Sequence, residues 1–383
     1  MSAHRKPELS LSQNQYLKEL AALFFKLGSI SFGGPAAHIA MMEDEVVKKR
    51  GWMTQQHFLD VMGATNIIPG PNSTEMTMHC GYERAGWKGL FVAGFCFILP
   101  AVVITGVFAW LYQEYGQLPA VEPFIYGIKP AVIAIIVMAA YRLGIKAFKT
   151  IELWVLGLAT LVACLLGVNE ILALFSCGAV GLMLYFIKRQ KGTLNSILPL
   201  IFLQGLTLVR MDTWQIFLTF LKIGAILYGS GYVLFAFLDA ELVTHGWLTR
   251  QALIDAVAVG QFTPGPVLST ATFIGWQMNG LWGALVATLG IFLPSFVFVA
   301  ILNPLIPKMR ASNIMGAFLD AVNVAAVAVI MAVCIAMGRE TITEWRTMVI
   351  AMASLVLVFV FKKLNSAFIV LGGAFLGYVL TLL

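Results

Sequence analysis

Charged residues are scarce in this chain, and that scarcity excludes most soluble folds. Asp, Glu, Lys and Arg together make up 11% of the 383 residues, whereas apolar residues make up 60%. A soluble domain is expected to be about 45–50% apolar and about 25% charged. The mean hydropathy of +0.87 and the repeated apolar runs therefore predict an all-α polytopic membrane protein. The formal charge of +6 is modest, and we expect the lipid bilayer rather than nucleic acid as a partner.

Cysteine and histidine are also rare, with five of each. The cysteines are scattered through apolar segments without a Cys-x-x-Cys pair, which favours packing over disulfides or metal ligands. The cluster "MTMHC" at 76–80 offers soft ligands, but adjacent helical positions face different directions. We therefore expect no metal and no cofactor. The chain also lacks a His-Glu-x-x-His motif, a Walker-type glycine loop and an obvious nucleophile with its base, so no catalytic residue is predicted.

Internal repetition is the strongest pattern that is present. "KLGSISFGGP" at 26 matches "KIGAILYGSG" at 222, "IPGP" at 68 matches "TPGP" at 263, and "AGWKGLFVAGFCFILPAVVI" at 85 matches "NGLWGALVATLGIFLPSFVF" at 279. Such duplication is typical of secondary transporters, whose substrate site lies between the repeats. The predicted parts are an N-terminal surface segment (1–19), a first membrane repeat (20–191), a linking transmembrane helix (192–211) and a second membrane repeat (212–383).

The distribution of basic residues predicts that the second repeat is inverted relative to the first. In the first repeat the connections 142–149 and 188–191 carry three Lys or Arg each, whereas 112–118 carries none. In the second repeat the bias reverses, with basic residues at 303–310 and 362–363. Because cytoplasmic loops are rich in Lys and Arg, equivalent connections lie on opposite sides of the membrane, and the linking helix supplies the extra crossing.

Each repeat begins with two apolar segments that proline and glycine interrupt. The first repeat has Gly33-Gly34-Pro35 and Pro69-Gly70-Pro71, and the second has Gly229-Ser230-Gly231 and Pro264-Gly265-Pro266. Backbone groups freed by such breaks are tolerated at membrane depth only inside the protein or facing a cavity. We predict broken or re-entrant helices, with re-entrant hairpins favoured over two fully spanning broken helices per repeat. Kinks that serve packing alone are the other interpretation.

The duplicated breaks predict a binding site for a small oxyanion. A helix that starts after Pro71 or Pro266 presents backbone amides and the positive end of its dipole, glycines allow close backbone approach, and hydroxyls donate to oxygens. Lys26 and Lys222 occupy equivalent places and could add positive charge, or they could extend to the membrane surface. Lys129, whose equivalent is Asn323, is either a third cation or an interfacial lysine. The predicted substrate-binding residues are Lys26, Gly33, Gly34, Pro35, Asn66, Pro69, Gly70, Pro71, Asn72, Ser73, Thr74, Lys222, Gly229, Ser230, Gln261, Pro264, Gly265, Pro266, Ser269 and Thr270.

Acidic side chains near the breaks are candidates for proton coupling. Asp60 and Asp255 are equivalent, as are Glu45 and Glu241, although matched acids beside a connection are as often caps or salt bridges. Glu75 and His79 lie one turn apart and could share a helix face, but Glu75 has Thr270 as its equivalent.

The paired "FGGP" and "PGP" motifs, the "GW" before the second segment and the duplication over nearly the whole chain resemble the chromate ion transporter (CHR) family, long-chain bidomain type. The resemblance implies a bacterial inner-membrane protein that exports chromate, linked to proton movement, with sulfate as a similar oxyanion. The second repeat has "YGSG" in place of "FGGP", so the two halves need not bind alike. An anion channel and a membrane enzyme that acts on lipid phosphate are the alternatives, and a homodimer is a candidate assembly.

Overall fold

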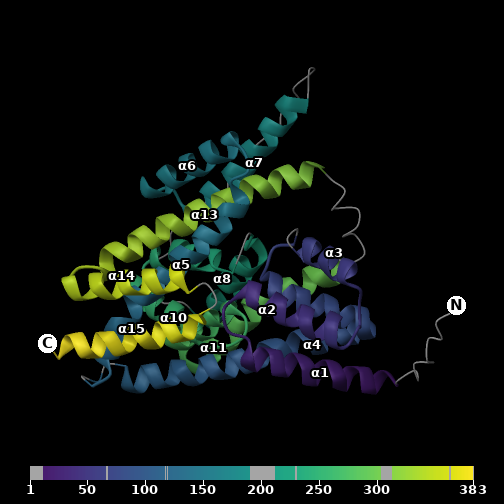
Figure 1. Cartoon of the computed structure of the whole chain (residues 1–383), viewed down its shortest axis with the longest axis horizontal. Coiled ribbons are helices and arrows are strands. Elements are labelled where there is room, and N and C mark those ends of the chain that lie inside the picture. Colours follow the sequence, from purple (N-terminus) through teal and green to yellow (C-terminus); the bar gives the residue numbers. More distant parts are fainter. Residues whose placement is uncertain are drawn as a thin grey trace.

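A computed structural model describes residues 12–65, 68–116, 118, 120–189, 212–228, 231–302, 313–361 and 364–382. These residues form helices and turns, with no strand among them (Figure 1). The first repeat contains α1 (Gln13–Ile30), α2 (Pro35–Glu43), a π-helical turn η1 (Asp44–Lys49), α3 (Gln55–Thr65), α4 (Asn72–Tyr115), α5 (Glu122–Ala147), α6 (Ile151–Leu165) and α7 (Glu170–Arg189). The expected linking helix at 192–211 lies outside the described residues.

The second repeat follows the same order. It contains α8 (Thr213–Ile226), α9 (Val233–Leu238), a π-helical turn η2 (Asp239–Val243), α10 (Arg250–Phe262), a 3₁₀ turn η3 (Val267–Ser269), α11 (Thr270–Leu302), α13 (Asn313–Thr341), α14 (Trp345–Val360) and α15 (Ser366–Thr381). Five helices in the described part of the chain are long and apolar enough to cross a bilayer, namely α4, α5, α7, α11 and α13. The protein is therefore a multi-pass α-helical membrane protein, as its composition predicts.

The stretch between the two breaks of the first repeat folds as two short helices, α2 and α3. α2 has 9 residues and α3 has 11, so each spans about 14–17 Å at 1.5 Å per residue. The hydrocarbon core is about 30 Å thick, so neither helix crosses it alone. Short helices beside a break occur both in re-entrant hairpins and in broken spanning helices, so the preference for re-entrant hairpins stays a prediction. Threonine side chains cap the first turns of α3 and α10, because Thr54 accepts a hydrogen bond from the His57 amide at 3.2 Å and Thr249 from the Ala252 amide at 3.1 Å.

α4 and α11 each fold back on themselves after their first few turns. The reversals lie at Ala85-Gly86 and Asn279-Gly280, where Gly86 and Gly280 take φ of 64° and 56°. Only glycine adopts such angles without strain. The two limbs of α4 then pass so closely at Gly81 and Gly89 that a side chain at either position would collide with the other backbone. Gly275 and Gly283 repeat this contact in α11.

Helices of each repeat pack against helices of the other repeat at their interface. α5 of the first repeat packs against α14 and α15 of the second, while α13 of the second packs against α6 and α7 of the first. Figure 1 shows α13 extending alongside α6 and α7, with α14 and α15 near α5. Gly127 of α5 meets Gly373 of α15 at backbone distance, which is the close approach that small residues permit in membrane proteins.

Equivalent helices run in opposite directions where they cross. Gly144 near the end of α5 packs against Val327 of α13, and Lys149 just beyond α5 forms an ion pair at 2.7 Å with Asp320, nearer the start of α13. A residue later in α5 therefore contacts a residue earlier in α13. This antiparallel relation is the one that inverted repeats require.

Candidate functional site

Each Pro-Gly-Pro turn bonds to the repeat to which it does not belong. The amide of Gly70 donates to the carbonyl oxygen of Leu227 at 2.7 Å, just after α8. The amide of Gly265 donates to the carbonyl oxygen of Ser31 at 2.8 Å, just after α1. Gly70 and Gly265 are sequence equivalents, and so are Ser31 and Leu227, so the two bonds are reciprocal. They satisfy carbonyl groups that the ends of α1 and α8 leave free.

The other break of each repeat lies at the same interface. Gly34 lies against the hydroxyl of Tyr232, and Gly231 lies within contact distance of Pro35. The four interruptions, which are far apart in the sequence, therefore meet at the interface between the repeats. Asn66, Gly229 and Ser230 of the predicted site lie outside the described residues.

His38 is a polar residue of this interface that the sequence analysis missed. It is 1% exposed, its Nδ1 lies 3.3 Å from the Ser73 hydroxyl, and its Nε2 lies 3.1 Å from the carbonyl oxygen of Ser31. His38 thus connects the first turn of α2 to the first turn of α4 and to the end of α1. Its position three residues after Pro35, immediately beyond a predicted break, was the available signal.

Glu75 is fully buried beside the first Pro-Gly-Pro turn. A side chain placed on Gly70 would collide with the Glu75 carboxyl and the Ser295 hydroxyl, so both groups fold over this glycine. Neither carboxylate oxygen of Glu75 has a hydrogen-bond partner among the described residues, and the same holds for Ser295 Oγ and Thr74 Oγ1. Ser295 was also missed. The signal lay in "FLPSFVF", where the first repeat has Ala101 in "ILPAVVI".

The second Pro-Gly-Pro turn is surrounded differently. Gly265 packs against the methyl group of Ala101 and the carbonyl oxygen of Gly28. The Thr105 hydroxyl donates to Ser269 at 3.1 Å, and the Thr270 hydroxyl donates to the carbonyl oxygen of Val267 at 2.8 Å. The two copies also continue differently, because α4 starts directly after Pro71 whereas a short 3₁₀ turn follows Pro266. Gln261 lies buried near the end of α10, with no partner for its Nε2 in the part of the chain that the structure describes.

Lys26 and Lys222 each pair with an acid of the following segment. Lys26 Nζ lies 3.3 Å from Glu45, and Lys222 Nζ lies 2.7 Å from Glu241. Both lysine side chains are about half exposed, whereas the two glutamates are nearly buried. The structure therefore joins the predicted lysines to the predicted proton-coupling glutamates rather than to His38 and Ser73.

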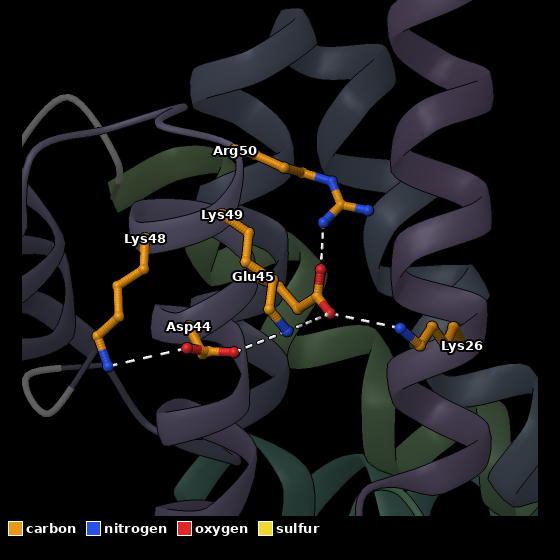
Figure 2. A network of polar contacts seen from close by, with 6 residues as sticks. All are labelled: Lys26, Asp44, Glu45, Lys48, Lys49 and Arg50. Atoms are coloured by element: carbon orange, nitrogen blue, oxygen red, sulfur yellow. Dashed lines mark hydrogen bonds and ion pairs between the residues drawn. The ribbon is translucent and has the colours of Figure 1, made fainter.

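The ion pair of the first repeat belongs to a larger network, shown in Figure 2, at the end of α2. Glu45 also accepts hydrogen bonds from Lys49 and Arg50, and Asp44 pairs with Lys49 at 2.8 Å. Burial by itself raises the pKa of Glu45, but the hydrogen bonds from Arg50, Lys49 and Lys26 outweigh it and hold that pKa below its usual value. An open cavity of 240 Å³ borders the network and is lined by Lys26, Leu27, Ile30, Ala40, Met41, Asp44, Glu45 and Lys49.

Asp60 and Asp255 are equivalent in sequence, but Asp60 lies at the surface and Asp255 is buried. Asp60 accepts a hydrogen bond from Gln56 at the surface of α3. Asp255 is 5% exposed and links the repeats, because it lies 3.2 Å from Lys129 of α5 and accepts a hydrogen bond of 2.7 Å from Tyr112 of α4. Lys129 is thus a partly buried cation with an acidic partner. His79 lies buried on α4 one turn beyond Glu75.

Comparison with known proteins identifies relatives over most of the chain. The family model described as "Chromate transporter" matches residues 18–182 and 214–378. A chromate transport protein of Cupriavidus metallidurans is 32% identical over 374 residues, which cover 95% of this chain and 93% of that protein. A probable chromate transport protein of Synechococcus elongatus is 33% identical and covers 89% of each chain. A chromate transport protein of Pseudomonas aeruginosa is 28% identical over 94% of this chain and 91% of that protein. No solved structure matches.

Proposed function

The chain belongs to the chromate transporter family, and from that premise we propose that it is a secondary active transporter that exports chromate across the bacterial inner membrane. Export is coupled to protons and confers chromate resistance on the cell. Two relatives with 32% and 28% identity are chromate transport proteins, which supports chromate as the substrate.

One structural observation carries the proposal of a transport pathway. Four chain breaks, two from each repeat, meet at the repeat interface and enclose buried polar groups of Ser31, His38, Ser73 and Glu75. Substrate sites of transporters with inverted repeats are built from interrupted helices in this position. Irregular backbone at membrane depth is costly, so its presence in both copies is best explained by the passage of a polar substrate.

The decisive experiment is a flux measurement in proteoliposomes that contain the purified full chain. A transporter accumulates chromate against its concentration gradient when a pH step or a membrane potential is imposed. A channel only dissipates the gradient, so failure of accumulation with retained leak favours the channel. Sulfate and molybdate added in excess report selectivity, and strong competition by sulfate makes it a second substrate.

We also propose that the chain has no enzymatic activity, because transport alone accounts for the buried polar groups. Incubation of the reconstituted protein with phospholipid and analysis of the lipid products tests this. A homodimer is the assembly to be tested, by mass measurement of the detergent-solubilised protein.

A further inference from the structure

The two Pro-Gly-Pro turns are equivalent in sequence but not in their surroundings. Beside Gly70 lie a carboxyl group and a hydroxyl group, those of Glu75 and Ser295. Beside Gly265 lie the methyl group of Ala101 and the Gly28 carbonyl oxygen. Ala101 and Ser295 are sequence equivalents, as are Glu75 and Thr270. At the first turn, Glu75 and Ser295 thus present polar groups. At the second turn, the equivalent residues are Thr270, whose hydroxyl is bonded to Val267, and Ala101, which is apolar.

The polar groups at the first turn are costly unless they serve a ligand. Glu75, Thr74 and Ser295 are all 0% exposed, and their side-chain oxygens find no hydrogen-bond partner in the described residues. Leaving buried polar groups unpaired destabilises a protein, and an ionisable group inside a membrane protein is by default functional. At the second turn the corresponding Thr270 hydroxyl is satisfied by Val267.

Three titratable side chains lie on the elements around Glu75. His79 lies one turn further along α4, His38 of α2 reaches Ser73, and Tyr228 beyond α8 is close enough to interact electrostatically with Glu75. No lysine or arginine among the described residues forms an ion pair with Glu75. Among the described residues, protonation is thus the one means of neutralising this carboxyl.

We propose that the transported oxyanion and the transported proton share one pocket, formed at the first turn by Gly70, Glu75, Ser295 and Ser73. This inference rests on the proposed function and specifies its binding site. Glu75 carries the proton on one carboxylate oxygen, and only in that neutral form does it allow the oxyanion to bind beside Glu75 and Ser295. The O–H of Glu75 and the hydroxyl of Ser295 then donate to the oxyanion. The second turn joins the repeats and does not bind substrate.

Charge repulsion makes the two binding events depend on each other. A negative carboxylate beside the oxyanion weakens its binding by roughly 100-fold or more at the short distances of one pocket. By thermodynamic linkage, oxyanion binding strengthens proton binding by the same factor. The proton and the oxyanion therefore travel in the same direction. One proton with a dianion leaves one net negative charge, which an inside-negative membrane potential drives outward.

The test compares chromate binding to the purified wild-type chain and to Glu75→Gln between about pH 6 and about pH 9, the range in which buried carboxylic acids titrate. Gln keeps the size of the side chain and mimics the neutral acid. We expect wild-type affinity to fall relative to Glu75→Gln as the pH rises, reaching a difference of roughly 100-fold. Both proteins meet the same chromate species at each pH, so the difference reports on Glu75. The exposed Glu152→Gln, whose carboxylate pairs with Lys188 on the surface, should retain the wild-type curve.

The outcomes separate this inference from the proposed function. A Glu75→Gln curve parallel to that of the wild type, or a folded Glu75→Gln that binds no chromate at any pH, overturns the shared pocket while chromate transport by the wild type stands. A wild type that neither binds nor transports chromate overturns both. In a second arm, Ser295→Ala should weaken binding roughly 5- to 10-fold without changing its pH dependence. Ser354→Ala removes a buried hydroxyl from α14 and is the matched control, which should leave chromate binding unchanged. Equal losses of affinity in Ser295→Ala and Ser354→Ala would contradict the pocket.

Discussion

Lys222 Nζ lies 2.7 Å from a carboxylate oxygen of Glu241, nineteen residues further along the chain. Lys26 and Glu45 form the equivalent pair in the first repeat with the same separation. In both copies the lysine connects the first helix of the repeat to the π-helical turn after the second. The copies differ in one respect, because Glu45 has Lys49 and Arg50 as further partners.

We expect Lys222→Met to destabilise the protein more than Lys26→Met. Glu241 is nearly buried, and Lys222 is its single ion-pair partner in the described residues, whereas Glu45 keeps two cations. Removing one partner of a fully buried pair costs about 3–5 kcal/mol. The lysine is half exposed, which reduces the expected cost of Lys222→Met to about 1–3 kcal/mol. Thermal unfolding of the purified variants measures the difference.

The double variant Lys222→Met, Glu241→Gln separates a structural lysine from a substrate-binding one. A structural lysine predicts that neutralising Glu241 restores both stability and chromate transport. If stability returns and transport stays absent, the ammonium of Lys222 acts on the oxyanion.

The network at the end of α2 should make stability sensitive to acid but not to pH changes near neutrality. Asp44 and Glu45 lie outside the five helices long enough to span a bilayer, the hydrogen bond from Lys49 lowers the pKa of Asp44, and hydrogen bonds from three cations lower that of Glu45. Groups whose pKa is lowered on folding stabilise the protein above their unfolded pKa and lose that contribution as the pH falls through the folded value. The contribution of this network to the melting temperature should thus be constant from about pH 6 to about pH 8 and be lost below about pH 4.5.

Glu45→Gln provides the control for this prediction. It removes one of the two depressed carboxyls, so the decline in acid should become shallower. A wild-type protein whose stability changes steeply near neutral pH, in a way that Glu45→Gln abolishes, would contradict it and would make Glu45 a proton carrier again.

The duplicated motifs predicted the helical class and the two repeats, because both copies interrupt an apolar segment with the same proline and glycine residues. A Pro-Gly-Pro in apolar sequence forces an interruption, and its repetition showed that the interruption is not a local accident. The helical class, the two repeats and the meeting of their breaks followed from that. The nearly constant sequence offset between the two copies also predicted which residues are equivalent, such as Gly70 and Gly265.

What the sequence left open depends on which side chains face each other across the interface. Glu75 and Ser295 come from different repeats, and nothing in their local sequence places one beside the other. The acidic partners of Lys26 and Lys222 were not predicted for the same reason, since Lys26 and Glu45 are neighbours only after α1 and α2 have packed. The reversals inside α4 and α11 were missed because Ala85-Gly86 and Asn279-Gly280 carry no proline.

Close packing of α1 against α4 should make Gly28 intolerant of any side chain. A Cβ at Gly28 would collide with the carbonyl oxygen of Phe97, and Gly224 repeats this relation with Ile291. Overpacking of this kind costs about 1–3 kcal/mol, so Gly28→Ala and Gly224→Ala should each lower the melting temperature. Gly106→Ala, which meets open space on α4, is the control and should leave it unchanged or raise it. Equal effects of all three would refute the close approach.

The buried pair of Lys129 and Asp255 should be a strong link between the repeats. Lys129→Met leaves a carboxylate that is 5% exposed without its cation, which costs about 3–5 kcal/mol. Adding Asp255→Asn should recover most of that loss. Lys149→Met removes the exposed pair with Asp320 and should cost less than about 1 kcal/mol. Urea unfolding of the three variants tests the ranking, and a small effect of Lys129→Met would show that the pair contributes little.

Inversion of the repeats should place equivalent connections on opposite sides of the membrane. Lys149 follows α5 and pairs with Asp320 in the first part of α13, whereas Thr343 follows the end of α13. The helix between Asp320 and Thr341 is about 32 Å long, which is close to the thickness of the hydrocarbon core. In a chain whose five cysteines are replaced, a membrane-impermeant thiol reagent added to intact cells should label Thr343→Cys and spare Lys149→Cys. Permeabilised cells should show labelling of both. Equal labelling of both sites in intact cells would mean that the repeats are parallel, because only an antiparallel α5 and α13 place these two ends on opposite faces.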